Sequence, residues 1–165
     1  MQRQRILKVA VALAGACAFA NAASASTAQN CLQISERRQV EEQYSNGQGQ
    51  PAVWLKQAGH PARGQTVFIT LRATNICADA LKPSVIDFTI PERMTYVLGS
   101  AKGHESDVVY SIDGKTYGRF DALAIHEGGG ARAARAEDIK SIRWIDRQTL
   151  APNSTRTVKF RAIAS

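Results

Sequence analysis

The sequence predicts an all-β protein, an antiparallel β-sandwich of about seven strands that follows a cleaved signal peptide. Three observations support this fold class. Strand-like runs in which apolar and polar residues alternate recur after residue 25, turn residues separate these runs, and no helix-period pattern of useful length appears among them. We therefore expect two segments, a signal peptide over residues 1–25 and one sandwich domain over residues 26–165.

The N-terminal segment has the three parts of a secretory signal peptide. An apolar run over residues 9–20 follows the cations, and small residues over 20–25 offer cleavage after Ala22 or Ala25; the cations are Arg3, Arg5 and Lys8. The apolar run is shorter than the roughly 20 residues that a membrane-spanning helix needs. The segment predicts export to the periplasm or the cell exterior, with no transmembrane segment in the mature chain.

A bacterial lipoprotein signal is the alternative interpretation of the same segment. Leu13-Ala-Gly-Ala-Cys17 is similar to a cleavage box in which the cysteine becomes lipidated, but Leu13 lies four positions before Cys17 rather than three. Cleavage at that point would also leave a very short apolar core. We therefore expect cleavage by the ordinary signal peptidase.

The charge of the mature chain is only mildly basic. Cleavage removes three cations and no acid, so the formal charge falls from +7 to +4. Such a surplus can favour anionic partners such as envelope polyanions, but ordinary solubility is the preferred interpretation of it. The lysines and arginines are scattered along the chain without a run of like charge, so we expect no basic patch and no nucleic-acid partner.

The individual strands are predicted from alternation and from the turns that bound them. The clearest run is 65–75, and an edge strand over 32–40 is protected from edge pairing by Glu36, Arg37 and Arg38. The main expected strands are 32–40, 65–75, 85–90, 94–98, 108–112, 141–146 and 156–163, and a short segment over 53–55 follows the turn after the first of them.

Three local features complete the predicted architecture. Asp113-Gly114 predicts a tight hairpin turn that leads into a return strand over 115–117. Residues 121–140 contain three consecutive glycines and an alanine-arginine stretch, and we expect a long surface loop there. Trp54 and Trp144 are interpreted as core residues.

The two cysteines of the mature chain are candidates for a disulfide bond. Cys31 precedes the first expected strand and Cys77 follows the 65–75 strand, so antiparallel pairing of these strands would place both cysteines at one end of the sandwich. An exported domain also meets an oxidising compartment. Two free buried thiols remain the alternative.

The sequence predicts no catalytic, cofactor-binding or metal-binding residues, and hence a protein that is not an enzyme. His60, His104 and His126 each lie in a loop-like context without a potential metal ligand at a useful spacing. No nucleophile elbow, phosphate-binding glycine loop or CxxC pair is present in the sequence.

The expected strands and turns, taken in order, resemble the bacterial "conserved repeat domain" family, and the resemblance covers nearly all of residues 32–162. The matching pieces are Gly64-Gln-Thr-Val-Phe-Ile-Thr-Leu71 with Thr74-Asn75, Val85-Ile-Asp87 with Ile90-Pro91, Met94-Thr-Tyr-Val97 with Gly99-Ser-Ala101, Tyr110-Ser-Ile-Asp-Gly114, Ile142-Arg-Trp144, Leu150-Ala-Pro152 and Val158-Lys-Phe-Arg-Ala162.

This resemblance implies an immunoglobulin-like antiparallel β-sandwich in the single-copy exported form of the family, and a role at the cell envelope or surface. It supplies no catalytic residues. Asn153 stands where the family usually has glycine, and the Cys77 turn is not typical of the family, so the disulfide prediction depends on this sequence alone.

Three function hypotheses follow. The first is a structural or interaction module of the envelope that binds a protein or polymer by a sheet face or edge. The second is a soluble binding domain for an anionic glycan that uses Arg132 and Arg135. The third is an enzyme, which would require a cleft near His104, His126 or Glu127.

Overall fold

The chain forms antiparallel β-sheets, as the sequence predicts. The computed structural model describes residues 31–165, so the predicted signal peptide, its cleavage sites and Cys17 lie outside the described residues. The strands of the described region are β1 (Leu32–Ser45), β2 (Pro51–Gln57), β3 (Thr66–Asn75), β4 (Val85–Thr89), β5 (Met94–Tyr96), β6 (Lys102–Gly103), β7 (Ser106–Ser111), β8 (Ala124–Glu127), β9 (Gly130–Ala133), β10 (Ser141–Asp146) and β11 (Thr155–Ala164).

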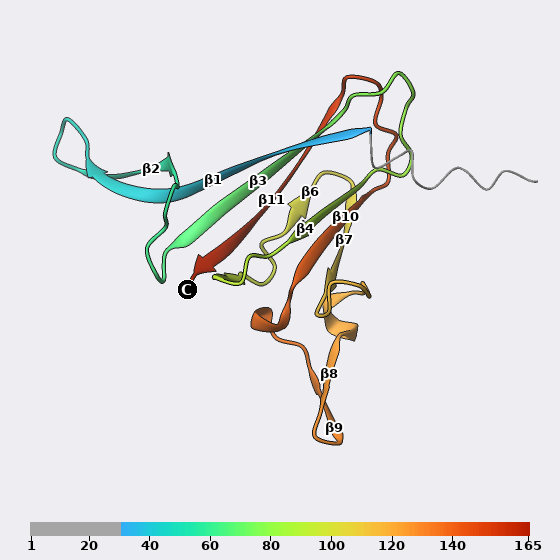
Figure 1. The fold of residues 1–165 in the computed structure, drawn as a ribbon. Coiled ribbons are helices and arrows are strands. Elements are labelled where there is room, and N and C mark those ends of the chain that lie inside the picture. The colour runs from blue at the N-terminus through green and yellow to red at the C-terminus, as the bar shows by residue number, and fades with distance from the viewer. Residues whose placement is uncertain (1–30) are drawn as a thin grey trace, which may run out of the picture.

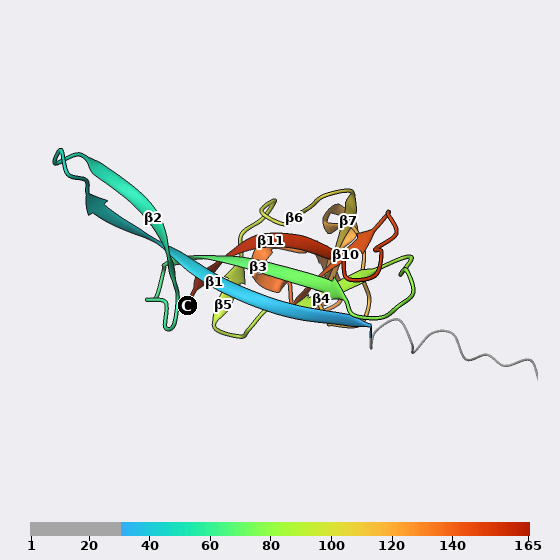
Figure 2. The same ribbon diagram turned by 90° about the horizontal axis from the view of Figure 1, so that it is seen from above.

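Two sheets form the sandwich (Figure 1). The large sheet has the order β2-β1-β3-β11-β5, with β6 also paired to β11, and the small sheet has the order β4-β10-β7. Seen from above, β1, β3 and β11 of the large sheet lie across the body, and the β1–β2 hairpin extends well beyond it (Figure 2). The predicted sandwich class is confirmed.

The chain crosses from one sheet to the other between β3 and β4, and it crosses again between β10 and β11. β3 pairs with β11 in the large sheet, and the strands adjacent to them in the chain, β4 and β10, pair in the small sheet. The last strand therefore lies opposite its predecessor, whereas immunoglobulin constant domains keep these two strands in one sheet. Sandwich domains share an architecture without always sharing this connectivity.

The core fills the space between the sheets with the inward side chains of the alternating strands. Burying each large apolar side chain contributes about 1.5–3 kcal/mol. The hydrophobic residues of the strands with 2 % or less of their surface exposed are Val67, Ile69, Leu71 and Ala73 of β3, Ile86 of β4, Tyr96 of β5, Ile142 and Trp144 of β10, and Val158, Phe160 and Ala162 of β11.

Aromatic rings connect the two layers of the core. The ring centroid of Phe160 lies 6.0 Å from that of Trp144 and 5.1 Å from that of Phe88, so β11 contacts both β10 and β4. Tyr96 and Tyr110 share a hydroxyl–hydroxyl hydrogen bond of 3.1 Å. Burial, with that hydrogen bond, raises the pKa of Tyr110 well above its usual value.

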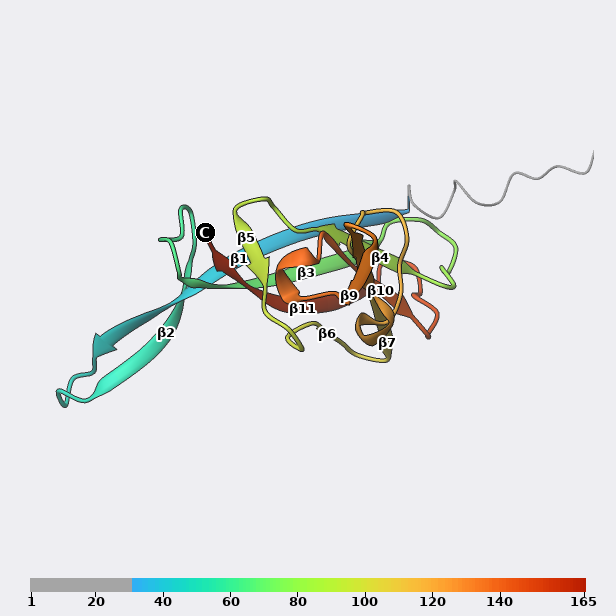
Figure 3. The same cartoon turned by 90° about the horizontal axis from the view of Figure 1, so that it is seen from below.

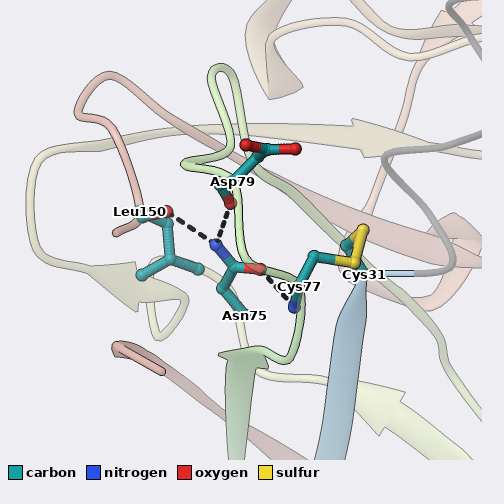
Figure 4. The surroundings of a disulfide bond; sticks show 5 residues. All are labelled: Cys31, Asn75, Cys77, Asp79 and Leu150. Atoms are coloured by element: carbon teal, nitrogen blue, oxygen red, sulfur yellow. Dashed lines mark hydrogen bonds between the residues drawn. A yellow bond between two sulfur atoms is a disulfide. The ribbon is translucent and has the colours of Figure 1, made fainter. Parts of the chain in front are cut away.

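The disulfide bond between Cys31 and Cys77 is formed, with 5.2 Å between the Cα atoms (Figure 4). Its basis is the predicted one, since β1 and β3 pair antiparallel and Leu32 lies opposite Asn75. The bond closes a span of 46 residues. In the chain-entropy model, a loop of this length contributes about 4 kcal/mol to stability.

Asn75 organises the turn that carries Cys77. Its buried amide donates hydrogen bonds to the carbonyl oxygens of Asp79 (2.8 Å) and Leu150 (3.0 Å), and its side-chain oxygen accepts one from the Cys77 backbone N–H (3.0 Å) (Figure 4). These three bonds satisfy a polar side chain that is 0 % exposed. The turn at Asn153 adopts φ 59°, the left-handed conformation that asparagine tolerates.

Two local predictions are wrong. Residues 115–117 do not form a return strand. The Asp113 carboxylate accepts 2.8 Å hydrogen bonds from the backbone N–H groups of Lys115 and Thr116, and these bonds hold the segment in a turn. Residues 121–140 are not one irregular loop. They contain the β8–β9 hairpin and the short 3₁₀ turn Ala136–Asp138, and a second such turn, Phe120–Ala122, begins just before them. None of the helical turns in residues 31–165 has the length and apolar character of a membrane-crossing helix.

Candidate binding surfaces

The histidines that sequence analysis considered lie in three separate elements. His60 is in the loop between β2 and β3, His104 is in the turn between β6 and β7, and His126 is in β8 rather than in a loop. Among the side chains that the structure describes, no three histidine, cysteine or acidic residues gather in a group that could hold a metal ion.

The arginines proposed for glycan binding are engaged in ion pairs. Arg132 forms a two-pronged pair with Asp138 (2.6 and 2.9 Å), and Arg135 lies 3.8 Å from Glu137. The Arg132 guanidinium, together with the Arg135 backbone N–H, lowers the pKa of Asp138 to about 2, so this acid stays ionised at neutral pH. The β8–β9 region therefore has no simple surplus of positive charge at these two positions.

A projecting hairpin is the first surface that stands out. We call residues 39–57 the arm: the second half of β1, the turn and β2. Asn46 holds the turn, because its side-chain oxygen accepts hydrogen bonds from the backbone N–H groups of Gln48 (3.0 Å) and Gln50 (2.9 Å). Figure 3 shows the arm extending beyond the other strands of both sheets.

Both faces of the arm expose large apolar side chains. Register places Tyr44 and Trp54 on the same face and Val53 and Leu55 on the other. Their exposed fractions are 49 %, 53 %, 56 % and 45 % in that order. Trp54 is therefore not a core residue, and that prediction is wrong for a physical reason: the arm extends beyond the small sheet, which would have covered it.

Polar contacts order the aromatic face of the arm. The indole Nε1 of Trp54 donates a 3.2 Å hydrogen bond to Glu42, and Lys56 lies 3.4 Å from the same carboxylate. The Tyr44 ring meets the Trp54 ring edge-on, with centroids 6.2 Å apart. The aromatic side chains are thus held in place while about half of their surface stays accessible.

The outer face of the large sheet is the second surface. Its outward positions carry a set of cations that we call the basic face: Arg37 of β1, Arg72 of β3, Lys102 of β6, and Lys159 and Arg161 of β11. Among the described residues, none of the five lies within ion-pair distance of an acid. The first outward acid along β1 is Glu41, which belongs to the arm.

Strand register brings these cations into neighbouring rows. One row crosses four strands as Arg37, Thr70, Lys159 and Lys102. With neighbouring strands about 4.8 Å apart, the row is about 14 Å long. Arg72 lies in the row on one side of it, between Ser35 and Thr157, and Arg161 lies in the row on the other side, beside Phe68.

The pairing of Lys159 with Lys102 works against stability, since like charges directly opposite each other on a sheet repel. β6 reaches this position because Gly103 has no side chain. A Cβ atom there would lie 3.0 Å from both Ser106 Oγ and Trp144 Cδ1. Gly103 therefore lets β6 pack close to Ser106 and Trp144, and this packing places Lys102 beside Lys159 of β11.

The basic face is hollowed. A groove of about 560 Å³ lies against Leu55 of the arm and Phe68, with Lys102, Lys159 and Arg161 among its lining residues. A second groove of about 400 Å³ is lined by Arg37 and Arg72 together with threonine and serine side chains. Glu36 also lines the second groove, and it is paired with Arg38.

These cations correct the prediction that no basic patch forms. They are distant in sequence and do not constitute a run, so a linear reading of charge misses them. The signal that could have found them is the alternation itself. In the 65–75 and 156–163 runs, arginine and lysine occupy outward positions without any acid on the same face.

No protein-family model matches the chain, and neither a curated protein nor a solved structure does so. The fold and its surfaces thus define a disulfide-bonded β-sandwich with two accessible surfaces, the arm and the basic face. The resemblance to the conserved repeat domains remains an expectation from sequence.

Proposed function

We propose that the chain is an exported, non-catalytic interaction module of the bacterial cell envelope or surface, and that its arm docks a protein partner. The observation that carries the proposal is the arm itself, a projecting hairpin whose four large apolar side chains are about half exposed. Clusters of this kind on a soluble domain mark interaction surfaces.

Export is supported by two independent features. The N-terminal sequence has the basic, apolar and small-residue order of a signal peptide. The Cys31–Cys77 disulfide is of the kind that persists in oxidising compartments such as the periplasm and the cell exterior. Both features agree with a mature chain that begins near Ser26.

The chemistry of the arm favours a protein as its partner. Tyrosine and tryptophan are enriched at protein interfaces because they offer a large apolar area together with a polar atom. Tyr44 and Trp54 present this combination, with Glu42 and Lys56 beside them. The turn at the tip is polar and carries no cation, unlike segments that bind the surface of an anionic membrane.

The arm also offers an edge for strand addition. β2 is the terminal strand of the large sheet, so the described part of the chain places no strand on its outer side. An extended segment of a partner can pair with such an edge through its backbone and gain specificity from side-chain contacts on both faces. Val53 and Leu55 would then meet one side of the partner, and Trp54 would meet the other.

Site-specific photo-crosslinking in the native envelope tests the proposal. A benzophenone amino acid is introduced at Tyr44 or Val53 in the arm, or at Lys115 as an exposed control position on the body. We expect a discrete adduct from the arm positions and little from Lys115. The double variant W54S/V53T, combined with benzophenone at Tyr44, should lose most of the adduct because it removes the apolar surface.

The outcomes separate the parts of the proposal. Equal adduct yields from the arm and from Lys115 would refute docking through the arm. An adduct with the mass of two copies would make the partner a second copy of this chain. The intact mass of the unmodified protein, beginning at Ser26 or Ala23, tests export, and a chain that retains Met1 would contradict it.

A further inference from the structure

We propose that the basic face is a binding site for an anionic polysaccharide that lies across β1, β3, β11 and β6. This site is separate from the arm and extends the proposed function to a second, chemically different ligand. It also replaces the Arg132 and Arg135 region as the place where an anionic glycan would bind.

The charge arrangement is the first argument. Five cations occupy three neighbouring rows, and no outward position of these rows holds an acid. The Lys159–Lys102 pair costs stability rather than adding to it, so the arrangement is not explained by folding. A ligand that carries regularly spaced negative charge would relieve this repulsion.

The shape of the face is the second argument. The larger groove is lined by Lys102, Lys159 and Arg161 and, among the described residues, by no acid, and a concave surface lined by one sign of charge concentrates its electrostatic potential. The second groove adds Arg37 and Arg72, and its one acid among the described residues, Glu36, is paired with Arg38. Leu55 of the arm and the Gly99–Ser100 turn line the larger groove. A flexible chain can enter such grooves, whereas a flat bilayer is kept away from them.

The uncharged side chains of the face specify the kind of polyanion. Ser35, Thr70 and Thr157 stand between or beside the cations, and Thr74 and Thr155 form the next outward row. Hydroxyl groups of this kind exchange hydrogen bonds with the hydroxyls of a sugar. Nucleic-acid surfaces instead combine cations with exposed aromatic rings for base stacking. Phe68, which is half-buried, is the one aromatic side chain in these rows.

Binding of defined polymers to the mature, disulfide-bonded chain tests the site. The probes are heparin and polygalacturonate as sulfated and carboxylated polysaccharides, with dextran as the neutral control. We expect the two anionic polymers to bind and dextran not to bind. Raising sodium chloride from about 50 to about 500 mM should weaken binding by at least about tenfold, since salt screens the cations.

A matched pair of charge variants locates the site. R72E/K159E should lower affinity for the anionic polysaccharides by at least about tenfold, because it reverses two charges in the grooves. K115E/K140E makes the same change in net charge at exposed positions outside the face, and it should change affinity by less than about threefold. Thermal unfolding of each variant confirms that it is folded.

Four results would overturn the inference: no binding of either anionic polysaccharide, equal losses in the two charge variants, binding confined to a twenty-nucleotide oligo-dT, or binding confined to phosphatidylglycerol vesicles. The arm variant W54S/V53T should keep its affinity for the polysaccharides. The two proposals can therefore fail separately: polysaccharide binding by the basic face can be confirmed when docking through the arm is refuted, and docking can be confirmed when polysaccharide binding is refuted.

Discussion

The outer faces of the two sheets differ in whether their cations are paired with acids. On the small sheet, Arg143 forms a two-pronged ion pair with Asp87 (2.6 and 2.9 Å), and its guanidinium lies 3.8 Å from the centre of the Tyr117 ring. Arg147 is likewise paired with Asp107. On the large sheet, no cation of the basic face has an acid opposite it on a described strand, and Lys159 lies opposite Lys102.

The difference shows that unpaired charge on the large sheet is not a requirement of the sandwich. Both faces are outer faces of twisted antiparallel sheets, and the small one satisfies its arginines with acids on neighbouring strands. Asp107 responds to that pairing, because the hydrogen bond from Arg147 lowers its pKa. The large sheet could carry similar partners and does not, and this is the basis of the proposed ligand.

Loss of the disulfide is expected to have the largest effect on stability, and the bond that it removes belongs to the large sheet. Cys31 and Cys77 join the chain at one end of the β1–β3 ladder, the ladder in which Arg37 lies opposite Thr70. The double variant C31S/C77S should lose about 4 kcal/mol of unfolding free energy, because the unfolded chain regains its loop entropy. Urea denaturation measures this loss. Equal stability of the parent chain with and without reductant would contradict it.

Removing one side chain from each face sharpens the comparison. Asp87→Ala takes away the partner of Arg143 and should cost up to about 1 kcal/mol of unfolding free energy, as expected for a well-formed surface ion pair. Arg72→Ala on the basic face should change it by less than about 0.5 kcal/mol, because no ion pair is lost. Urea denaturation of the two variants side by side provides the test. If Arg72→Ala were the more costly, the face would be structural.

The smallest expected effect has the opposite sign. Lys159→Glu replaces a repelling pair with an attractive one opposite Lys102 and should raise the unfolding free energy by about 0.2–1 kcal/mol. Thermal unfolding at low and high salt measures the gain, which should shrink as salt increases. Lys159→Gln serves as a control with roughly half the effect. A destabilised Lys159→Glu protein would show that the lysine has a structural partner.

Much of the fold follows from sequence because alternation reports burial directly. β3, β10 and β11 lie within one or two residues of their expected positions, and the disulfide follows from the placement of Cys31 and Cys77 at the ends of strands. The β8–β9 hairpin was missed because its short strands alternate weakly and are joined by glycines. The return strand expected after Asp113-Gly114 is absent because the aspartate side chain accepts hydrogen bonds from the backbone N–H groups that this strand would have used, and the chain pairs back only at the Tyr110–Gly118 bridge.

The candidate surfaces were less accessible to sequence reasoning. Alternation tells which side of a strand a residue occupies, but it does not tell which residue lies beside it on the next strand. Arg37, Thr70 and Lys159 become neighbours only through the β1–β3 and β3–β11 registers. Trp54 was assigned to the core because a strand pattern does not report where the opposite sheet ends.

The continuous course of β1 has a mechanical consequence. The C-terminal half of β1 belongs to the arm, and Cys31, which forms the disulfide, immediately precedes its N-terminal end. Nine residue pairs join β1 to β3. Hydrogen bonds of an antiparallel ladder stand perpendicular to the strands, so a pull along the axis of β1 loads these pairs together instead of one after another. If a partner pulled on the arm along this axis, the β1–β3 hydrogen bonds would resist the force in shear. The Cys31–Cys77 disulfide would hold the end of β1 even after those bonds broke.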